Sequence, residues 1–179
     1  MSKESVPARY HPVHVVLHWL VAFMVIGAFA IGMIYLDSTP NSAPEKITYL
    51  QYHAIWGSLL ALIFITRLIT RFAFKRPAPA DAGHPALNVI AKVVHFFLYV
   101  GVFVMLLSGA SMFMQAGLMN VFAGQASLPE DFRIFPPRGV HGITFSILFL
   151  LILLHISAAL YHQFIRKDNL FGRMWFGKR

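Results

Sequence analysis

The sequence predicts an all-α membrane protein, a bundle of four transmembrane helices, and three observations support this fold class. Hydrophobic residues make up 58% of the 179 residues and charged residues only 12%, about half the charged fraction of a soluble domain. Four segments are apolar over the roughly 20 residues that a helix needs to cross the bilayer core. Their apolar positions follow a helical period and not the alternation of a β-barrel. A water-soluble globule is therefore excluded, and the lipid bilayer is an expected partner.

Each span is justified by its length and by the placement of its charges. The first and fourth spans are uncharged, the second carries Arg67 and Arg71 near its end, and the third carries Lys92 near its start. Long cationic side chains at these positions can reach the membrane surface. One domain is expected over residues 1–179. The four expected spans are residues 13–36, 52–74, 88–114 and 139–165.

Three proline-containing connections join the spans, at residues 37–51, 75–87 and 115–138. The third connection is too apolar to extend into water, so a short interfacial helix or lid is expected there. A signal peptide is the alternative for the first span, because Ala28-Phe29-Ala30 resembles a cleavage site. The apolar run continues past this site to Leu36, which favours a retained span.

The distribution of Lys and Arg predicts the orientation. With the N-terminus inside, twelve basic residues are cytoplasmic and three are outside, so both termini are expected in the cytoplasm of a bacterial inner-membrane protein. The twelve are Lys3, Arg9, Arg67, Arg71, Lys75, Arg76, Lys92, Arg166, Lys167, Arg173, Lys178 and Arg179, and the three are Lys46, Arg133 and Arg138. The net charge of +8 thus reflects a membrane surface and not a nucleic-acid partner.

The absence of cysteine excludes thiol catalysis, disulfides and iron–sulfur clusters, and it directs attention to the nine histidines. An imidazole in hydrocarbon is costly unless it has a partner. His53 and His141 are both expected about 15 Å from the membrane centre towards the outside, and His18 and His155 are expected to meet on the inner side. His141 and His155 are fourteen residues apart, so they face the same interior about 21 Å apart along the axis. Three other histidines, His11, His14 and His84, are expected to be solvated or to lie in a loop.

Two depth-matched imidazole pairs, with apolar walls and no carboxylate at the same level, suit iron already held in a macrocycle better than a bare ion. We therefore expect two haem b groups with bis-histidine iron, held without covalent attachment because no C-x-x-C-H motif is present. The expected iron ligands are His18 with His155 and His53 with His141. His95 is an open alternative to His18. Each histidine could instead form an ordinary interhelical polar contact.

These features resemble the bacterial cytochrome b561 family over almost the whole chain. The resemblance rests on His18-Trp19 after a basic N-terminus, Tyr52-His53 followed by Arg67 and Arg71, His95, the His141 to His155 spacing, and the tail from His162 to Leu170 with Arg173-Met174. It implies the same four axial ligands and the activity of the short members that pass electrons from superoxide to ubiquinone. Lys92 and Gln163 depart from related chains, which have histidines at or near these positions.

A quinone that takes up two electrons and two protons requires titratable groups near water, and the cytoplasmic end supplies them. We expect His95 and His162 to contact the quinone or deliver protons, with Lys92, Tyr161, Arg71 and Asp168 at the same level. Arg67 is a candidate for a haem propionate, since a guanidinium matches a carboxylate. Arg67 and Arg71 are thus the expected cofactor-binding cations.

At the outer end, Arg138 lies one turn before His141, Arg133 is expected nearby, and Lys46 is expected on the other outer loop. This positive patch could guide superoxide to the outer haem. The alternative function is a haem-b electron-transfer subunit that docks to a periplasmic dehydrogenase or cytochrome, a redox partner protein. A small proton or metal-ion transporter is a third reading, which the lack of mid-span helix breaks disfavours.

Overall fold

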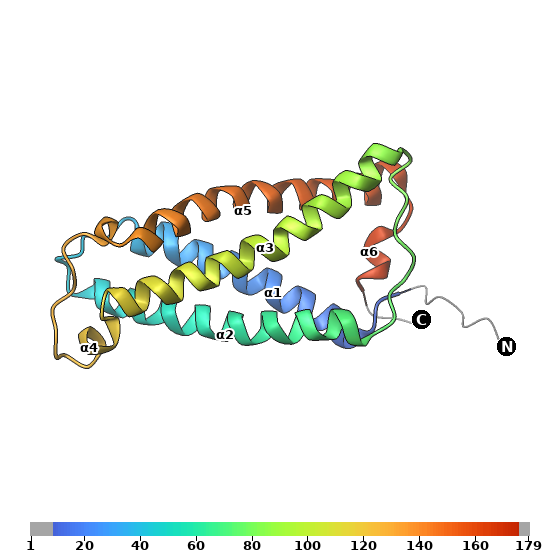
Figure 1. Ribbon diagram of the computed structural model, residues 1–179. Helices are drawn as coiled ribbons and strands as arrows, with labels where there is room; N and C mark the ends of the chain where they lie inside the picture. The colour runs from blue at the N-terminus through green and yellow to red at the C-terminus, as the bar shows by residue number, and fades with distance from the viewer. Residues whose placement is uncertain (1–8, 176–179) are drawn as a thin grey trace.

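The computed structural model describes residues 9–175, and these residues form helices and no strand. Four long helices run the length of the molecule, and two of them end in a π-helical turn (Figure 1). The long helices are α1 (Pro12–Ala30) with η1 (Ile31–Leu36), α2 (Glu45–Ala73), α3 (Pro85–Gln115), and α5 (Pro136–Leu160) with η3 (Tyr161–Arg166). The short ones are α4 (Leu118–Phe122), η2 (Phe132–Ile134) and α6 (Leu170–Arg173). The expected number of four membrane-spanning helices is confirmed, and α2 begins at Glu45 and not at residue 52.

Proline and histidine define where two of these helices start. Pro12 and Pro85 each occupy the first turn, where a missing N–H is tolerated. The residues before them, His11 and His84, accept hydrogen bonds from backbone N–H groups inside the helices. Both histidines therefore serve as helix caps.

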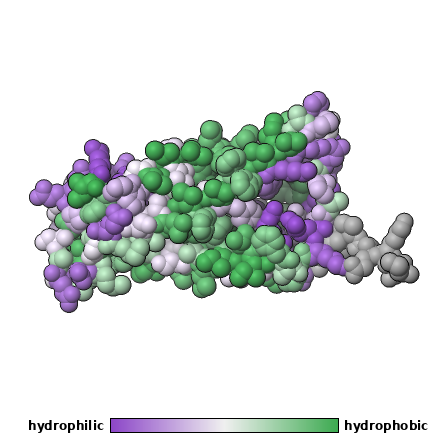
Figure 2. All heavy atoms as spheres, in the orientation of Figure 1, coloured by the Kyte–Doolittle hydropathy of each residue, from purple (hydrophilic) through white to green (hydrophobic). Residues whose placement is uncertain are grey.

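The bundle consists of two closely packed helix pairs, α1 with α2 and α3 with α5. A small core at mid-length joins them, formed by Met24, Val25, Leu60, Phe64, Val102 and Leu148. Most other large apolar side chains point outward; Phe72, for example, is 77% exposed. Figure 2 shows an apolar band between two polar ends. All four long helices are long and apolar enough to cross a membrane, so the outward apolar surface faces lipid.

Both ends of the described chain lie at the same end of the bundle (Figure 1). The Tyr10 amide donates to the Arg173 carbonyl at 3.2 Å, and Trp19 Nε1 donates to the Met174 carbonyl at 3.0 Å. We call this the terminal end, and we call the opposite end, with the connections at 37–44 and 116–135, the loop end. The four-span topology thus places residues 9 and 175, the two ends of the described chain, on one side of the membrane.

The third connection folds back over the loop end, as the sequence predicts. Its helix α4 buries Leu118 and Val121 in a second apolar cluster that includes Ile47 of α2. Asn41, in the first connection, donates through Nδ2 to the carbonyls of Pro129 and Glu130, both at 3.0 Å. These contacts tie the two loop-end connections together.

Lys46 differs from the sequence prediction of an outer loop residue that adds to a positive patch. It lies in the first turn of α2, is 6% exposed, and donates to the carbonyls of Leu36 and Thr39. Carbonyls at the end of a helix lack partners within the helix, and the ammonium satisfies them here. The charge of Lys46 is therefore used in joining the first two spans.

Candidate functional site: two histidine pairs

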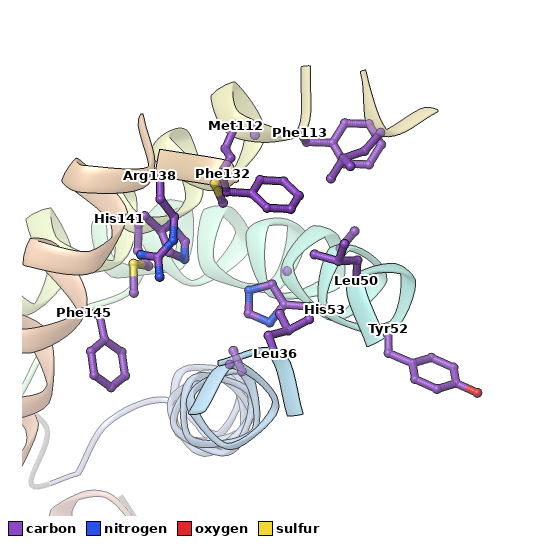
Figure 3. A pocket seen from close by; sticks show the side chains of 18 of the residues that line it. Leu36, Leu50, Tyr52, His53, Met112, Phe113, Phe132, Arg138, His141 and Phe145 are labelled. Atoms are coloured by element: carbon purple, nitrogen blue, oxygen red, sulfur yellow. The ribbon is translucent and has the colours of Figure 1, made fainter. Parts of the chain in front are cut away.

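The loop-end pair joins α2 to α5. The ring centres of His53 and His141 are 6.3 Å apart, and the ring planes meet at 74°. Both rings line a cavity of about 1320 Å³ with mostly apolar walls. Figure 3 shows the two rings facing this cavity from different helices, with the Arg138 side chain beside His141. The cavity is larger than the 300–1,000 Å³ typical of pockets for small ligands.

Two glycines, Gly57 and Gly109, line this cavity and leave space beside the paired rings. Gly57 lies one turn after His53, and a Cβ built there would meet no atom within 4 Å. A Cβ on Gly109 of α3 would lie 3.4 Å from Cε1 of His141. Side chains at these two positions would therefore project towards the space beside the paired rings.

Ser108, which the sequence analysis did not single out, orients one ring of the loop-end pair. Its buried hydroxyl donates to the Met105 carbonyl at 3.0 Å and lies 3.0 Å from Nδ1 of His141. Since the hydroxyl proton is used, the serine oxygen accepts from Nδ1–H, which leaves Nε2 of His141 free as a ligand. The only sequence signal was a serine within an apolar span. Nδ1 of His53 is buried and has no hydrogen-bond partner within residues 9–175.

The terminal-end pair joins α1 to α5. The ring centres of His18 and His155 are 6.2 Å apart, and their planes meet at 75°, nearly the same arrangement as the loop-end pair. His95 of α3 approaches His155 more closely, with ring centres 5.0 Å apart. Its Nδ1–H donates to the Ala91 carbonyl at 2.6 Å. The structure thus brings three histidines together at this level.

A layer of buried polar side chains lies between the terminal-end pair and the terminal end of the bundle. His14, which we expected to be solvated, is only 3% exposed, so that prediction was wrong. Its ring lies 3.4 Å from the Thr70 hydroxyl and its carbonyl accepts from Arg67 at 3.1 Å. Helix α1 enters the bundle beside the end of α2, and this packing buries the first turn, which sequence position alone does not reveal.

His162 and His95 have different partners. His162, in η3, is 8% exposed and forms a 2.5 Å hydrogen bond through Nδ1 with Oδ2 of Asp168. Arg166 Nε lies 3.7 Å from the same carboxylate oxygen. Burial disfavours the charged form of Asp168, but the hydrogen bond with His162 and the nearby charges outweigh it and lower the pKa of Asp168. Asp168 therefore holds His162 in one orientation.

The donors available fit a metal carried by a macrocycle. Within residues 9–175, no group of three or more His, Asp or Glu side chains could hold a metal ion. Each histidine pair supplies two nitrogen ligands, whereas a structural zinc ion takes four protein ligands. A haem iron, which has four equatorial nitrogens of its own, requires only the two axial ligands that a pair offers.

Comparisons with known proteins agree with this chemistry. A family model described as prokaryotic cytochrome b561 matches residues 9–177. The chain is 29% identical over 189 positions to cytochrome b561 homolog 2 of Escherichia coli (strain K12), covering 97% of this chain and 95% of that protein. It is 24% identical over 179 positions to the probable superoxide oxidase CybB of Yersinia pestis, covering 96% and 98%. It is 23% identical over 171 positions to cytochrome b561 homolog 1 of Escherichia coli (strain K12), covering 93% and 96%.

Proposed function

The chain belongs to the prokaryotic cytochrome b561 family, an electron-transfer family whose members hold haem b, and we propose that it is a superoxide:ubiquinone oxidoreductase with two haem b groups. The finer activity draws on the relative named a probable superoxide oxidase, which the chain matches over nearly its whole length. The reaction is balanced when two superoxide ions, one quinone and two protons give two molecules of oxygen and one quinol.

The distance between paired rings is the observation that carries the two-haem part of this proposal. Metal–imidazole bonds are about 2.0 Å long. Each imidazole centre lies about 1 Å behind its nitrogen, so two rings bound to opposite sides of one metal have centres roughly 6 Å apart. The two pairs are separated by 6.2 and 6.3 Å. His95 and His155, at 5.0 Å, are too close for a metal between them. This supports His18 with His155 and His53 with His141 as the axial ligands.

The surroundings of the loop-end pair fit a flat apolar cofactor. The cavity beside His53 and His141 is mostly apolar, and Gly57 leaves one turn of α2 without a side chain against it. When bound, haem b supplies a one-electron iron couple. The histidine pairs hold the iron, and Ser108 keeps Nε2 of His141 directed at it.

Arg138 is proposed to attract superoxide at the loop end. It lines the cavity together with Arg133, and Asp131 and Glu130 line the same cavity with opposite charge. Since Lys46 is occupied by carbonyl groups, the attraction rests on Arg138 beside His141. A local positive charge raises the encounter rate of a small anion.

His95 and His162 are proposed to serve the quinone at the terminal end. Because Asp168 accepts a hydrogen bond from Nδ1 of His162, the other ring nitrogen of this histidine is available to exchange a proton. His95 lies against His155 and bonds to its own helix through Nδ1, so its Nε2 is likewise available. The two histidines can thus supply the two protons that the quinone needs.

The terminal end is proposed to face the cytoplasm of a bacterial inner membrane. Of the twelve Lys and Arg residues within residues 9–175, nine belong to segments at this end, and basic residues are enriched in cytoplasmic segments. Superoxide would then react on the periplasmic side.

The test is to purify the protein in detergent, count haem b per chain from the visible spectrum, and mix it with superoxide and ubiquinone. Two haems per chain and quinol formation with superoxide alone are expected. His53→Ala and His155→Ala should each lose one haem, and retention of full haem content in both would refute the ligand assignment. Two haems without quinol formation would instead favour a subunit that takes electrons from a partner protein.

A further inference from the structure

Two arginine side chains of α2 converge on one tyrosine of α3 at the terminal end. The guanidinium carbon of Arg67 lies 5.8 Å from the Tyr99 ring centre, and that of Arg71 lies 4.9 Å from it. The arginines are one turn apart, on the same face of α2. Arg67 is 8% exposed, and its one hydrogen bond to the His14 carbonyl leaves several of its five N–H donors for other groups.

No carboxylate of the described chain is paired with these arginines. Residues 9–175 contain only two acidic residues at the terminal end, Asp81 and Asp168. Asp81 accepts hydrogen bonds from Asn88 and Gly83, and Asp168 is bonded to His162. A buried guanidinium without an anion is costly. The charge of this cluster therefore requires an anion that residues 9–175 do not supply.

Tyr99 adds a neutral donor to the cluster. Its hydroxyl is buried and has no hydrogen-bond partner within the described residues. A buried hydroxyl without a partner costs about 1–3 kcal/mol, so an acceptor is expected beside it. The three side chains thus offer two cationic forks and one hydroxyl at one place.

The cluster lies beside the terminal-end histidine pair. Arg67 donates to the carbonyl of His14, which lies one helical turn before His18 on α1. Tyr99 lies one turn from His95, whose ring contacts that of His155. The anion that the cluster requires must therefore sit next to whatever these histidines hold.

We propose that Arg67, Arg71 and Tyr99 form the binding site for the carboxylates of the haem held by His18 and His155. This inference rests on the proposed function, because it takes haem as the occupant of the pair. Planar guanidinium groups bind carboxylates through two parallel hydrogen bonds, and the tyrosine hydroxyl supplies a further donor. A lipid phosphate is the other anion of suitable charge, but the burial of Arg67 between α1, α2 and α3 favours a ligand inside the bundle.

The experiment uses the complete protein with its haem labelled by carbon-13 at the carboxyl groups, from cells fed labelled aminolaevulinate. Redox-difference infrared spectra report the labelled carboxylate bands, and potentiometric titration reports the midpoint potential of each haem. The variants are Arg67→Gln, Arg71→Gln and Tyr99→Phe. Arg76→Gln is the matched control, because it removes one exposed charge from the same end.

Each arginine variant is expected to lower the midpoint potential of one haem, because a nearby positive charge stabilises the reduced form, and to shift the labelled band. Tyr99→Phe should shift the band, and Arg76→Gln should match the wild type. If Arg67→Gln does not accumulate, Arg67→Lys keeps the charge without the planar fork and should still shift the band. If all these variants contain two haems and have wild-type bands and potentials, the inference is overturned but the proposed function is not. If the carboxylate band of the arginine variants stays at its wild-type position, and added anionic lipid shifts the haem potential of the wild type, the inference is overturned in favour of a lipid phosphate. A colourless wild-type protein would overturn the proposed function as well.

Discussion

Replacement of Ser108 by alanine tests whether His141 binds haem iron through Nε2. In the native protein the serine hydroxyl is 3.0 Å from Nδ1 of His141 and donates to the Met105 carbonyl at 3.0 Å. In the haem-bound state the iron bond fixes the ring, so Ser108→Ala removes the serine oxygen that accepts from Nδ1–H. An unpaired buried donor costs about 1–3 kcal/mol.

That cost corresponds to haem affinity at the loop end that is about 10–100-fold weaker, the usual effect of removing such a partner. The helix itself should not be weakened, because alanine has a higher helix propensity than serine by up to about 0.7 kcal/mol. The assay is the rate of haem transfer from purified protein to an excess of apomyoglobin. One haem of the two should leave faster, and the other should leave at the wild-type rate.

The matched control is Ser146→Ala, which removes an exposed hydroxyl bonded only to the Gly142 carbonyl of its own helix. This variant should retain both haems as the wild type does. If Ser108→Ala lost haem no faster than Ser146→Ala, the assignment of Nε2 of His141 as an iron ligand oriented by Ser108 would be refuted.

Three further predictions concern the cavity, the core and the terminal end. Gly57→Leu should reduce the haem count from two to one, because its side chain would enter the cavity where no protein atom lies within 4 Å of the new Cβ; a count of two contradicts this. Gly27→Ala should lower the free energy of unfolding by about 1–3 kcal/mol, because the added Cβ would lie 2.6 Å from Cζ2 of Trp56, whose indole is held by a hydrogen bond to the α1 backbone. Thermal unfolding in detergent measures this, and an unchanged Tm argues against it. The lowered pKa of Asp168 means that its ionised carboxylate stabilises the fold. This stabilisation is fully present at pH values above the ordinary pKa of about 3.9, and it is lost as the pH falls through the lower pKa of the folded protein. The stability advantage of the wild type over Asp168→Asn should therefore shrink on acidification below about pH 4, and a constant difference excludes this role.

The spans and the pairing of the histidines were accessible from sequence because they depend on local quantities. Hydrophobic length fixes which segments cross a bilayer, and a constant rise per residue converts position into depth. His53 and His141 were expected at one depth and lie 6.3 Å apart. The fourteen-residue interval on α5 likewise placed His141 and His155 at separate levels of the same interior.

The depth of a residue in the membrane does not say which side chains of other helices it contacts, and this depends on tertiary packing. His18 and His95 lie at similar depths, and the ring separations, 6.2 against 5.0 Å from His155, are what favours His18 as the proposed partner. Ser108 became a functional candidate because α3 packs along α5 and brings its hydroxyl to His141.

The sequence by itself determined the number of spans and the levels of the histidines, since each follows from composition along one helix. Only the tertiary structure decided that His14 is buried, that Lys46 binds carbonyl groups and that Arg67, Arg71 and Tyr99 meet without an acidic partner in the described chain. These facts depend on the rotation of each helix about its own axis and on its neighbours. Membrane helices are rotated into place by side-chain packing and interhelical hydrogen bonds between segments far apart in sequence, so no single segment encodes them.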